Sequence, residues 1–570
     1  MTTRNFRPVA AAIGMTIGIC LAVPAWSQQD AGAYLAARAA SSEQDYAASE
    51  KYFAEALRAD PDNPILLDSV LAARIGLGEF DAAERPANRL VELGIESQLA
   101  HLVRQVTAIE DGDWSAVLSR IEAGEEIGPL VDGLAQAWSL VGNGQMTDAI
   151  RTFDGVIEAR GLRAFGLYHK AIALSSVGDL EGAEAILALP PTQGMQRTRR
   201  STIAQIEVLS RLDRNADAVA LIDAVFGTDP DAAIADLRRR LEAGETLPVT
   251  IAPNAAAGMA EAYLSVAGAL DGETADSYTL IYARASLALR PADSDTVLLT
   301  GELLDRMGRF AMSEATYRLI DQSNPAFPTA ELGRSEVLRK DGRIEAATEV
   351  LFALSRAFPD NPNIKVSLGN LLRETGRLPE AITAYSRALE LYPEGEPMVW
   401  LTHYMRGIAL HRTDSWEEAE ADFRAALMLE PRQPQVLNYL GYSLVERQEK
   451  LDEALEMIEA AVAQRPENGA IVDSLGWVLF RLGQYDEAVT HLERATELEP
   501  MESVINDHLG DAYWAVGRLT EAQFQWNRAL SLNPEEKEAI RLRDKLELGL
   551  DAVLARDGEQ PLIQVADDEG

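Results

Sequence analysis

The residues that most often carry out chemistry in proteins show no catalytic spacing in this sequence. The six histidines form no HExxH or HxxxH pair: they are His101, His169, His403, His411, His491 and His508. His403 and His411 are about two helical turns apart and could share a helix face, but no cysteine or paired carboxylate accompanies them. The sequence also contains no GxSxG, P-loop or GxGxxG motif. We therefore expect no catalytic residues, no metal site and no cofactor.

The charge balance excludes whole classes of partner. The 570 residues include 90 acidic and 52 basic side chains, which gives a formal net charge of −38. A chain this acidic repels phosphate backbones and anionic lipid surfaces. The short basic runs at 197–200 and 238–240 do not reverse this balance. We therefore expect no nucleic-acid binding.

An internal repeat supplies the elements that would position any binding surface. Residues 475–500 align with residues 509–534, so that Gly476 matches Gly510 and Pro500 matches Pro534, each pair 34 residues apart. Small residues recur in step along the second half of the chain, at Gly301, Ser335, Gly369, Gly407, Gly441, Gly476 and Gly510. Closing prolines accompany them, at Pro325, Pro359, Pro393, Pro431, Pro466, Pro500 and Pro534.

Each repeat predicts two helices separated by a turn. Gly483 can end the first helix because glycine tolerates a left-handed backbone, and Pro500 prevents the second from continuing. Gly476 lies inside the first helix, where glycine costs about 1 kcal/mol relative to alanine. We interpret it as a point of close approach to the facing helix near Ala488.

This pattern resembles the tetratricopeptide repeat family, whose motif has a small residue in the first helix, alanines in the second and a terminal proline. The resemblance covers residues 294–537 best. It implies an all-α fold, a right-handed superhelical solenoid of antiparallel helix-turn-helix repeats (an α-α superhelix). The first helices of such repeats line a concave groove.

The repeat pattern also predicts how the chain is organised. Residues 28–230 are interpreted as a degenerate N-terminal array of the same repeats, and 231–255 as an irregular break. Residues 256–537 form the C-terminal array, in which 294–537 holds the clearest repeats. Residues 538–555 are expected to form a capping helix that covers the last apolar face. Residues 556–570 are expected to form a disordered acidic tail.

Residues 1–27 have the features of a cleaved export signal. Arg4 and Arg7 precede an apolar run over 9–23, which is short for a membrane span of about 20 residues, and small residues follow at 25–27. We expect a mature chain from Gln28, without a transmembrane segment, in a bacterial periplasm, either free or associated with the envelope. An uncleaved anchor is the alternative. Lipidation of Cys20, the only cysteine, is disfavoured because Ile19 precedes it.

The family resemblance implies which residues face the groove, since they flank the small residue of each first helix. They are Asn370, Tyr404, His411, Arg412, Asn438, Tyr442, Asp473, Trp477, Phe480, Asp507, Asp511 and Trp514. Aromatic side chains are typical anchors of a bound partner, and asparagine can hydrogen-bond an extended peptide. The alternative is that Trp477, Phe480 and Trp514 only fill the core between repeats. Arginines are few among these acids, which argues against gripping a terminal carboxylate and favours a neutral or basic peptide.

The combined features predict a non-enzymatic scaffold that binds another protein or an extended peptide. The export signal and the long repeat array resemble bacterial periplasmic tetratricopeptide proteins, some of which present substrates to C-terminal processing proteases. A structural component of an envelope or secretion assembly is the alternative. A remote alternative is an enzyme with a site in 231–292, a block that holds no nucleophile–base pair of its own.

Overall fold

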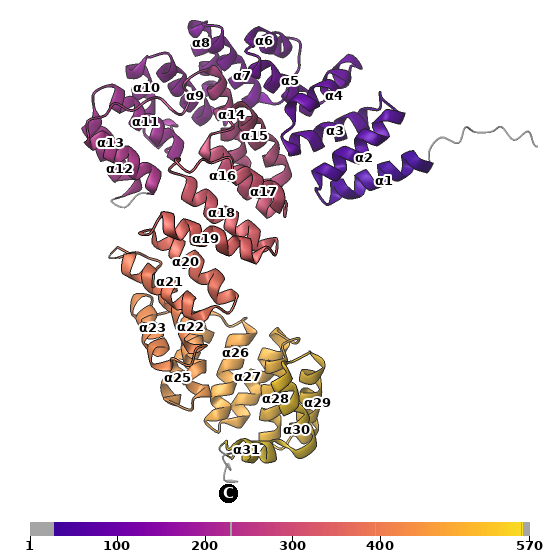
Figure 1. The fold of residues 1–570 in the computed structure, drawn as a ribbon, viewed down its shortest axis with the longest axis vertical. Coiled ribbons are helices and arrows are strands. Elements are labelled where there is room, and N and C mark those ends of the chain that lie inside the picture. The colour runs from indigo at the N-terminus through magenta and orange to yellow at the C-terminus, as the bar shows by residue number, and fades with distance from the viewer. Residues whose placement is uncertain (1–27, 228–230, 394, 560, 563–570) are drawn as a thin grey trace, which may run out of the picture. The chain divides into compact units, whose positions relative to one another are not determined.

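The chain is all-α throughout the part that the structure describes. A computed structural model describes residues 28–227, 231–393, 395–559 and 561–562, and in these ranges all regular structure is helical, with no strand (Figure 1). The expected export signal, residues 1–27, lies outside the described residues, as does 563–570 of the expected tail. None of the described helices is both long and apolar enough to cross a membrane.

The helices follow one another as antiparallel neighbours. In the first part of the chain they are α1 (Gln28–Ser42), α2 (Tyr46–Ala59), α3 (Pro64–Leu77), α4 (Phe80–Glu92), α5 (Gln98–Glu110), α6 (Trp114–Glu122), α7 (Pro129–Gly142), α8 (Met146–Glu158), α9 (Arg163–Ser176), α10 (Leu180–Leu187), α11 (Arg199–Arg211), α12 (Asn215–Phe226), α13 (Ala232–Glu242), α14 (Ala255–Leu270), α15 (Asp276–Leu289), α16 (Ser294–Arg306), α17 (Phe310–Tyr317) and α18 (Phe327–Lys340), with a short 3₁₀ turn at Pro191–Gln193.

The second part continues the same alternation. It contains α19 (Ile344–Ala357), α20 (Pro362–Glu374), α21 (Leu378–Leu391), α22 (Val399–His411), α23 (Trp416–Leu429), α24 (Pro434–Glu446), α25 (Leu451–Gln464), α26 (Gly469–Arg481), α27 (Tyr485–Leu498), α28 (Ser503–Ala515), α29 (Leu519–Ser531), α30 (Glu536–Leu548) and α31 (Leu550–Asp557).

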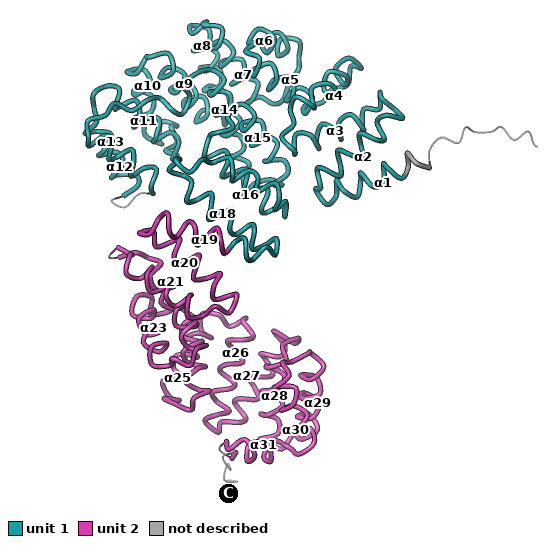
Figure 2. Tube along the Cα trace, in the orientation of Figure 1, with its two compact units in different colours: residues 1–347 teal, residues 348–570 magenta. Residues whose placement is uncertain are grey.

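The chain divides into two compact units, 1–347 and 348–570 (Figure 2). This division falls inside α19. The predicted helix/loop break at 231–255 lies within unit 1, where α13 is followed by an irregular stretch in which Leu247 and Ile251 are buried.

The glycine of each repeat lies under a large side chain of the following helix. A Cβ added at Gly476 would lie 2.5 Å from Leu492 Cγ. Leu492, one turn beyond the expected Ala488, is therefore the residue that needs the space. The same relation recurs at Gly369 under Tyr385, Gly407 under Phe423 and Gly510 under Trp526. The close approach of large side chains offsets the poor helix propensity of glycine.

The C-terminal cap consists of two helices where the sequence predicted one over 538–555. Gly549 separates α30 from α31 with a φ of +83°, a conformation that residues other than glycine rarely adopt. The expected tail from residue 556 is also partly structured, because α31 extends to Asp557 and Glu559 forms ion pairs.

Candidate functional site

Unit 2 contains a groove of about 920 Å³ along the inner faces of α24, α26, α28 and α30. These are the first helices of successive hairpins, so the groove lies where the family resemblance implies a binding surface. Its wall includes Tyr442, Glu446, Trp477 and His508. Two apolar side chains, Val504 and Ile540, add an exposed hydrophobic rim, with exposed fractions of 41% and 50%.

The structure places only part of the predicted set on this groove. Tyr442, Trp477, Asp507 and Asp511 line it. The other predicted residues lie outside its wall, at Asn370, Tyr404, His411, Arg412, Asn438, Asp473, Phe480 and Trp514. The groove therefore covers the C-terminal end of the predicted surface, from α24 onward.

The predicted residues on α20 and α22 are largely engaged within the chain. The side-chain amide oxygen of Asn370, Oδ1, accepts a hydrogen bond from the Tyr385 hydroxyl at 2.7 Å. Tyr404 and His411 pack edge-on against the Tyr439 ring, with centroids 6.0 Å and 5.8 Å apart. Asn438 on α24 is half-buried, and Arg412, directly after α22, is exposed.

Trp477 is held between two other rings. It stacks on Phe480 with centroids 4.9 Å apart and on His508 with centroids 4.0 Å apart, and it is 8% exposed. Its indole N–H donates to Glu446 Oε1 at 2.7 Å. Most of the ring therefore contributes to packing between repeats, and only its margin reaches the groove.

Trp514 lies beside the C-terminal cap, away from the groove. Its indole N–H donates to Asp551 of α31 at 2.9 Å, and its ring lies 5.4 Å from the Trp526 ring. A Cβ at Gly549 would lie 2.6 Å from this ring. Trp514 thus contacts the turn between α30 and α31.

Several acidic residues in or beside the groove pair with cations from the next inner helix. Asp473 on α26, which lies outside the groove wall, contacts His508 Nδ1 on α28 at 3.0 Å. Burial favours the neutral imidazole, but the charge and hydrogen bond of Asp473, with Asp507 and Asp511 nearby, raise the pKa of His508. On α28, Asp507 and Asp511 both contact the Lys545 ammonium, at 2.7 Å and 2.8 Å.

The sequence-based prediction did not include Lys545 among the groove residues, because Lys545 belongs to the predicted capping helix rather than to a repeat. It is 2% exposed, and the two carboxylates raise its pKa even though burial opposes the charge. A signal was available, since Lys545 follows Asp511 by one repeat length of 34 residues. Glu559 was also missed: it pairs with Arg481 at 3.2 Å and with Arg541 at 2.5 Å at the edge of the groove.

After these pairings the groove keeps an excess of negative charge. Within the described residues, Glu446, Glu535 and Glu538 have no cationic partner within ion-pair distance, and among the lining cations only Lys537 lacks an acidic one. Burial raises the pKa of the Tyr442 hydroxyl, and the negative charges of Glu446, Asp473, Glu538 and Asp507 add to this effect. The groove is therefore suited to a neutral or positively charged group.

The corresponding inner face of unit 1 is filled by the chain itself. Helix α14 packs against α7 and α9, and α15 packs against α3 and α5. Tyr263 donates its hydroxyl to Gln105 at 2.6 Å, and the Arg284 side chain donates to the Gly76 carbonyl at 3.1 Å. A Cβ at Gly258 would lie 2.4 Å from the Trp138 ring. This close contact leaves no room for a protein segment between α14 and α7.

A serine and a histidine meet in unit 1, although 231–292 holds no histidine. Ser265 Oγ lies 3.3 Å from His169 Nε2, and the Trp138 indole N–H donates to His169 Nδ1 at 3.2 Å. Burial lowers the pKa of His169 to about 3, so the ring is neutral and its one proton is on Nε2. That nitrogen donates to the serine oxygen, which is the reverse of the polarity that activates a nucleophile.

The described residues hold no group of three or more histidine, cysteine, aspartate or glutamate side chains arranged to bind a metal ion. His403, one member of the pair considered from the sequence, instead contacts Asp422 at 2.7 Å. Asp422 also binds Arg406 at 2.6 Å. These contacts link α22 to α23 and serve the packing of one hairpin.

Comparison with known proteins identifies the repeats. Three tetratricopeptide repeat models match the chain, one at 332–396, 366–436 and 404–469, a second at 445–507 and a third at 32–63. The TPR repeat-containing protein PA4667 of Pseudomonas aeruginosa is 28% identical over 185 residues. That match covers 32% of this chain and only 30% of the length of the relative.

Solved structures are similar at low identity. The APC/C hetero-tetramer Cut9-Hcn1 is 15% identical, with 92% of this chain and 97% of that chain covered and a TM-score of 0.37. YrrB, described as a TPR protein with an unusual peptide-binding site, is 21% identical, with 35% and 99% covered and a TM-score of 0.28. On the family-model matches and the helical hairpins together, the chain contains tetratricopeptide repeats at 32–63 and along 332–507.

Proposed function

We propose that the chain is a non-enzymatic scaffold that holds a segment of a partner protein in the groove of unit 2. One observation carries this proposal: the inner faces of α24, α26, α28 and α30 form a groove of about 920 Å³, while the inner face of unit 1 is already filled. The rim formed by Val504 and Ile540 offers apolar contact. The tetratricopeptide repeat fold suggests protein–protein interaction in general.

The partner segment is neutral or basic. Glu446, Glu535 and Glu538 leave the groove with uncompensated negative charge, and the net charge of −38 extends the attraction beyond it. A basic segment would meet the Tyr442 hydroxyl and these carboxylates, and its apolar side chains would meet Val504 and Ile540. Binding should therefore weaken as salt rises.

The setting that we propose is the bacterial cell envelope, with the chain exported and cleaved before Gln28. The signal-like pattern of residues 1–27 supports this setting. Within it, we propose an adaptor role, in which the scaffold presents a bound protein to a protease. The resemblance to exported repeat proteins supports that role, and a structural part in an envelope assembly is the alternative.

The test is affinity purification from the envelope fraction, with the co-purifying proteins identified. Val504→Arg with Ile540→Arg should reduce partner recovery by about tenfold, because both arginines replace apolar contacts at the rim. Phe524→Arg on α29 is the matched control: its side chain is 65% exposed and does not line the groove. Equal recovery by the double variant and the control would overturn the groove assignment.

The adaptor role is tested separately with the purified components. An adaptor should accelerate cleavage of the co-purified substrate by the co-purified protease, and the groove variant should remove that acceleration. A stable complex with fixed stoichiometry and no protease would point to a structural component.

The intact mass of the native protein should correspond to a chain that begins at Gln28, and a mass that retains Met1 contradicts export with cleavage.

A further inference from the structure

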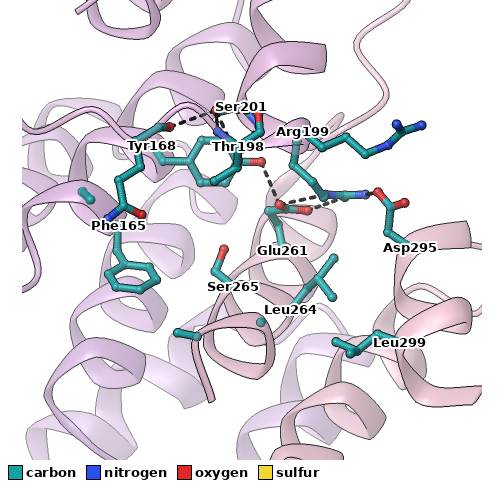
Figure 3. Close-up of a pocket in the computed structure, with 15 residues that line it drawn as sticks. Phe165, Tyr168, Thr198, Arg199, Ser201, Glu261, Leu264, Ser265, Asp295 and Leu299 are labelled. Carbon is teal, nitrogen blue, oxygen red and sulfur yellow. Dashed lines mark hydrogen bonds and ion pairs between the residues drawn. The ribbon is translucent and has the colours of Figure 1, made fainter. Parts of the chain in front are cut away.

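A second concavity, of about 420 Å³, lies within unit 1 and takes no part in the proposed function. It is bounded by α9, by the start of α11, by α14 and by α16 (Figure 3). Figure 3 shows Phe165, Leu264 and Leu299 among its walls, with Ser265 between the apolar side chains and Glu261. Its volume lies within the range of about 300–1,000 Å³ that is typical of small-molecule sites.

The charged groups at one end of this cavity are already paired with one another. Arg200 donates to Glu261 at 3.0 Å and to Asp295 at 2.6 Å, and it also contacts Asp293 at 3.2 Å. The Tyr168 hydroxyl donates to the same Glu261 at 2.7 Å. Arg200 is thus surrounded by three carboxylates and has no capacity left for an anionic ligand.

The second arginine of the lining is also engaged. Arg199 forms a two-pronged ion pair with Asp231, with one contact at 3.0 Å. Across the lining itself, Arg199 and Arg200 balance Glu261 and Asp295. The remaining polar groups are neutral, among them Ser265, Gln196 and Thr198. A charged ligand would be desolvated here without gaining a counter-charge, which is unfavourable.

We infer that this cavity binds a neutral, largely apolar small molecule. Phe165, Leu264 and Leu299 would contact its apolar body, and the Ser265 hydroxyl would hydrogen-bond one polar group on it. An apolar cavity with a few fixed polar groups is the usual construction of such a site. The inference is independent of the groove, because every lining residue belongs to unit 1.

Two fluorescent probes with the same aromatic body test the ligand class. N-phenyl-1-naphthylamine is neutral. In 1-anilinonaphthalene-8-sulfonate the same aromatic rings carry an added sulfonate group, which gives one negative charge. The full-length protein should bind one molecule of the neutral probe saturably. The sulfonate should bind about tenfold more weakly, because its charge finds no free cation in the cavity. Equal affinities, or no saturable binding of the neutral probe, would overturn the inference.

Glycine substitutions locate the bound probe. A Cβ at Gly268 meets no atom within 4 Å, so a side chain can start at this lining position, and Gly268→Phe adds a ring there. This variant should reduce the affinity for the neutral probe by about tenfold. Gly155→Phe on α8 is the matched control, since Gly155 is also helical with no atom within 4 Å of an added Cβ, and it lies outside the cavity.

Two further variants distinguish binding in the cavity from binding at another surface of the protein. Ala269→Trp adds bulk at an exposed lining position and should reproduce the loss seen with Gly268→Phe. The double variant Val504→Arg and Ile540→Arg should leave probe binding unchanged, since both residues belong to the groove of unit 2. Probe binding that survives both cavity variants, or that is lost in the groove variant, would show that the site lies elsewhere.

Discussion

Unit 1 and unit 2 build their inner faces from the same kind of helical hairpin, but they use those faces differently. In unit 1, α14 and α15 cover the inner helices, and the polar residues there bind one another, as Tyr263 does with Gln105. In unit 2, the inner helices α24, α26, α28 and α30 leave a groove of about 920 Å³. The comparison shows that a repeat array does not by itself provide a binding surface: its inner face must also remain uncovered.

The two units also differ in how their charged side chains are paired. In unit 1, Arg200 is enclosed by Glu261, Asp293 and Asp295, so the charge is neutralised inside the fold. In unit 2, Lys545 and His508 neutralise some of the inner carboxylates, but Glu446 and Glu538 remain. We expect unit 1 to respond to substitution mainly through stability and unit 2 through both stability and binding.

The largest effect is expected where α14 fills unit 1. Trp138 is fully buried, lies against Gly258 of α14 and donates to His169. Trp138→Ala should cost about 3–5 kcal/mol by leaving a cavity between α7 and α14. Hydrogen exchange should show the loss in 28–346, with unit 2 as the internal control. Equal loss in both units, or none in unit 1, would mean that α14 does not stabilise the inner face.

A smaller loss is expected from Trp477 in unit 2, where the ring fills the space between Phe480 and His508. Trp477→Ala should destabilise unit 2 by about 3 kcal/mol, near the lower end of the range for buried aromatic residues, because part of the ring margin borders the groove. Phe524→Ala, at an exposed position, is the control. Unchanged melting of the Trp477 variant, combined with lost partner binding, would restore Trp477 as a binding anchor.

The sequence identified the repeat because its signals are local. Gly476 and the residue that covers it, Leu492, are separated by one hairpin, and Gly369 with Tyr385 repeats the spacing. Periodicity therefore predicted the helices and the turns of the repeats. The role of Trp477 was harder to predict, because the ring that encloses it, His508, comes from the next repeat.

The filling of unit 1 had no local signal. The contact between Arg284 and the Gly76 carbonyl joins residues 208 positions apart, and Tyr263 and Gln105 are 158 apart. Helix α14 continues the helical pattern, and nothing in its own residues states that it packs on α7 rather than on a neighbour in sequence. The cavity beside Glu261 depends on the same long-range packing, so it could not be predicted either.

A third expected effect is on the pH dependence of stability, and it differs between His169 in unit 1 and His508 in unit 2. Burial lowers the pKa of His169 in unit 1 to about 3, whereas Asp473 raises the pKa of His508 in unit 2. His169 is neutral when folded and protonates when unfolded, so its contribution falls by about 1.4 kcal/mol for each pH unit below about 6.5. His508 gains its proton in the folded state, so its contribution is full at low pH and is lost as pH rises through its folded pKa.

Glu207 hides this effect in the unmodified unit 1. Burial raises the pKa of Glu207 to about 7, so its contribution grows as pH falls from 7 and opposes that of His169. Burial also raises the pKa of Glu110, Asp132 and Glu184, so the contribution of His169 is measured as a difference between two variants. Below about pH 6.5, Glu207→Gln should lose about 1.4 kcal/mol per pH unit more than the double variant Glu207→Gln with His169→Phe. Hydrogen exchange between pH 7 and pH 5 measures both profiles, and equal slopes contradict the assignment.

The smallest effect concerns Glu559, which contacts Arg481 and Arg541 at the edge of the groove. These side chains are partly exposed, so Glu559→Gln should change the stability of unit 2 by only about 0.5 kcal/mol. It also removes one negative charge from the lining, so a basic partner segment should bind about twofold more weakly. Glu497→Gln on α27 removes the same charge from an exposed position outside the groove and should leave affinity unchanged. Tighter binding by the Glu559 variant would contradict this expectation. It would mean that residues 558–559, which follow α31, compete for the groove, and that unit 2 covers part of its own inner face as unit 1 does with α14 and α15.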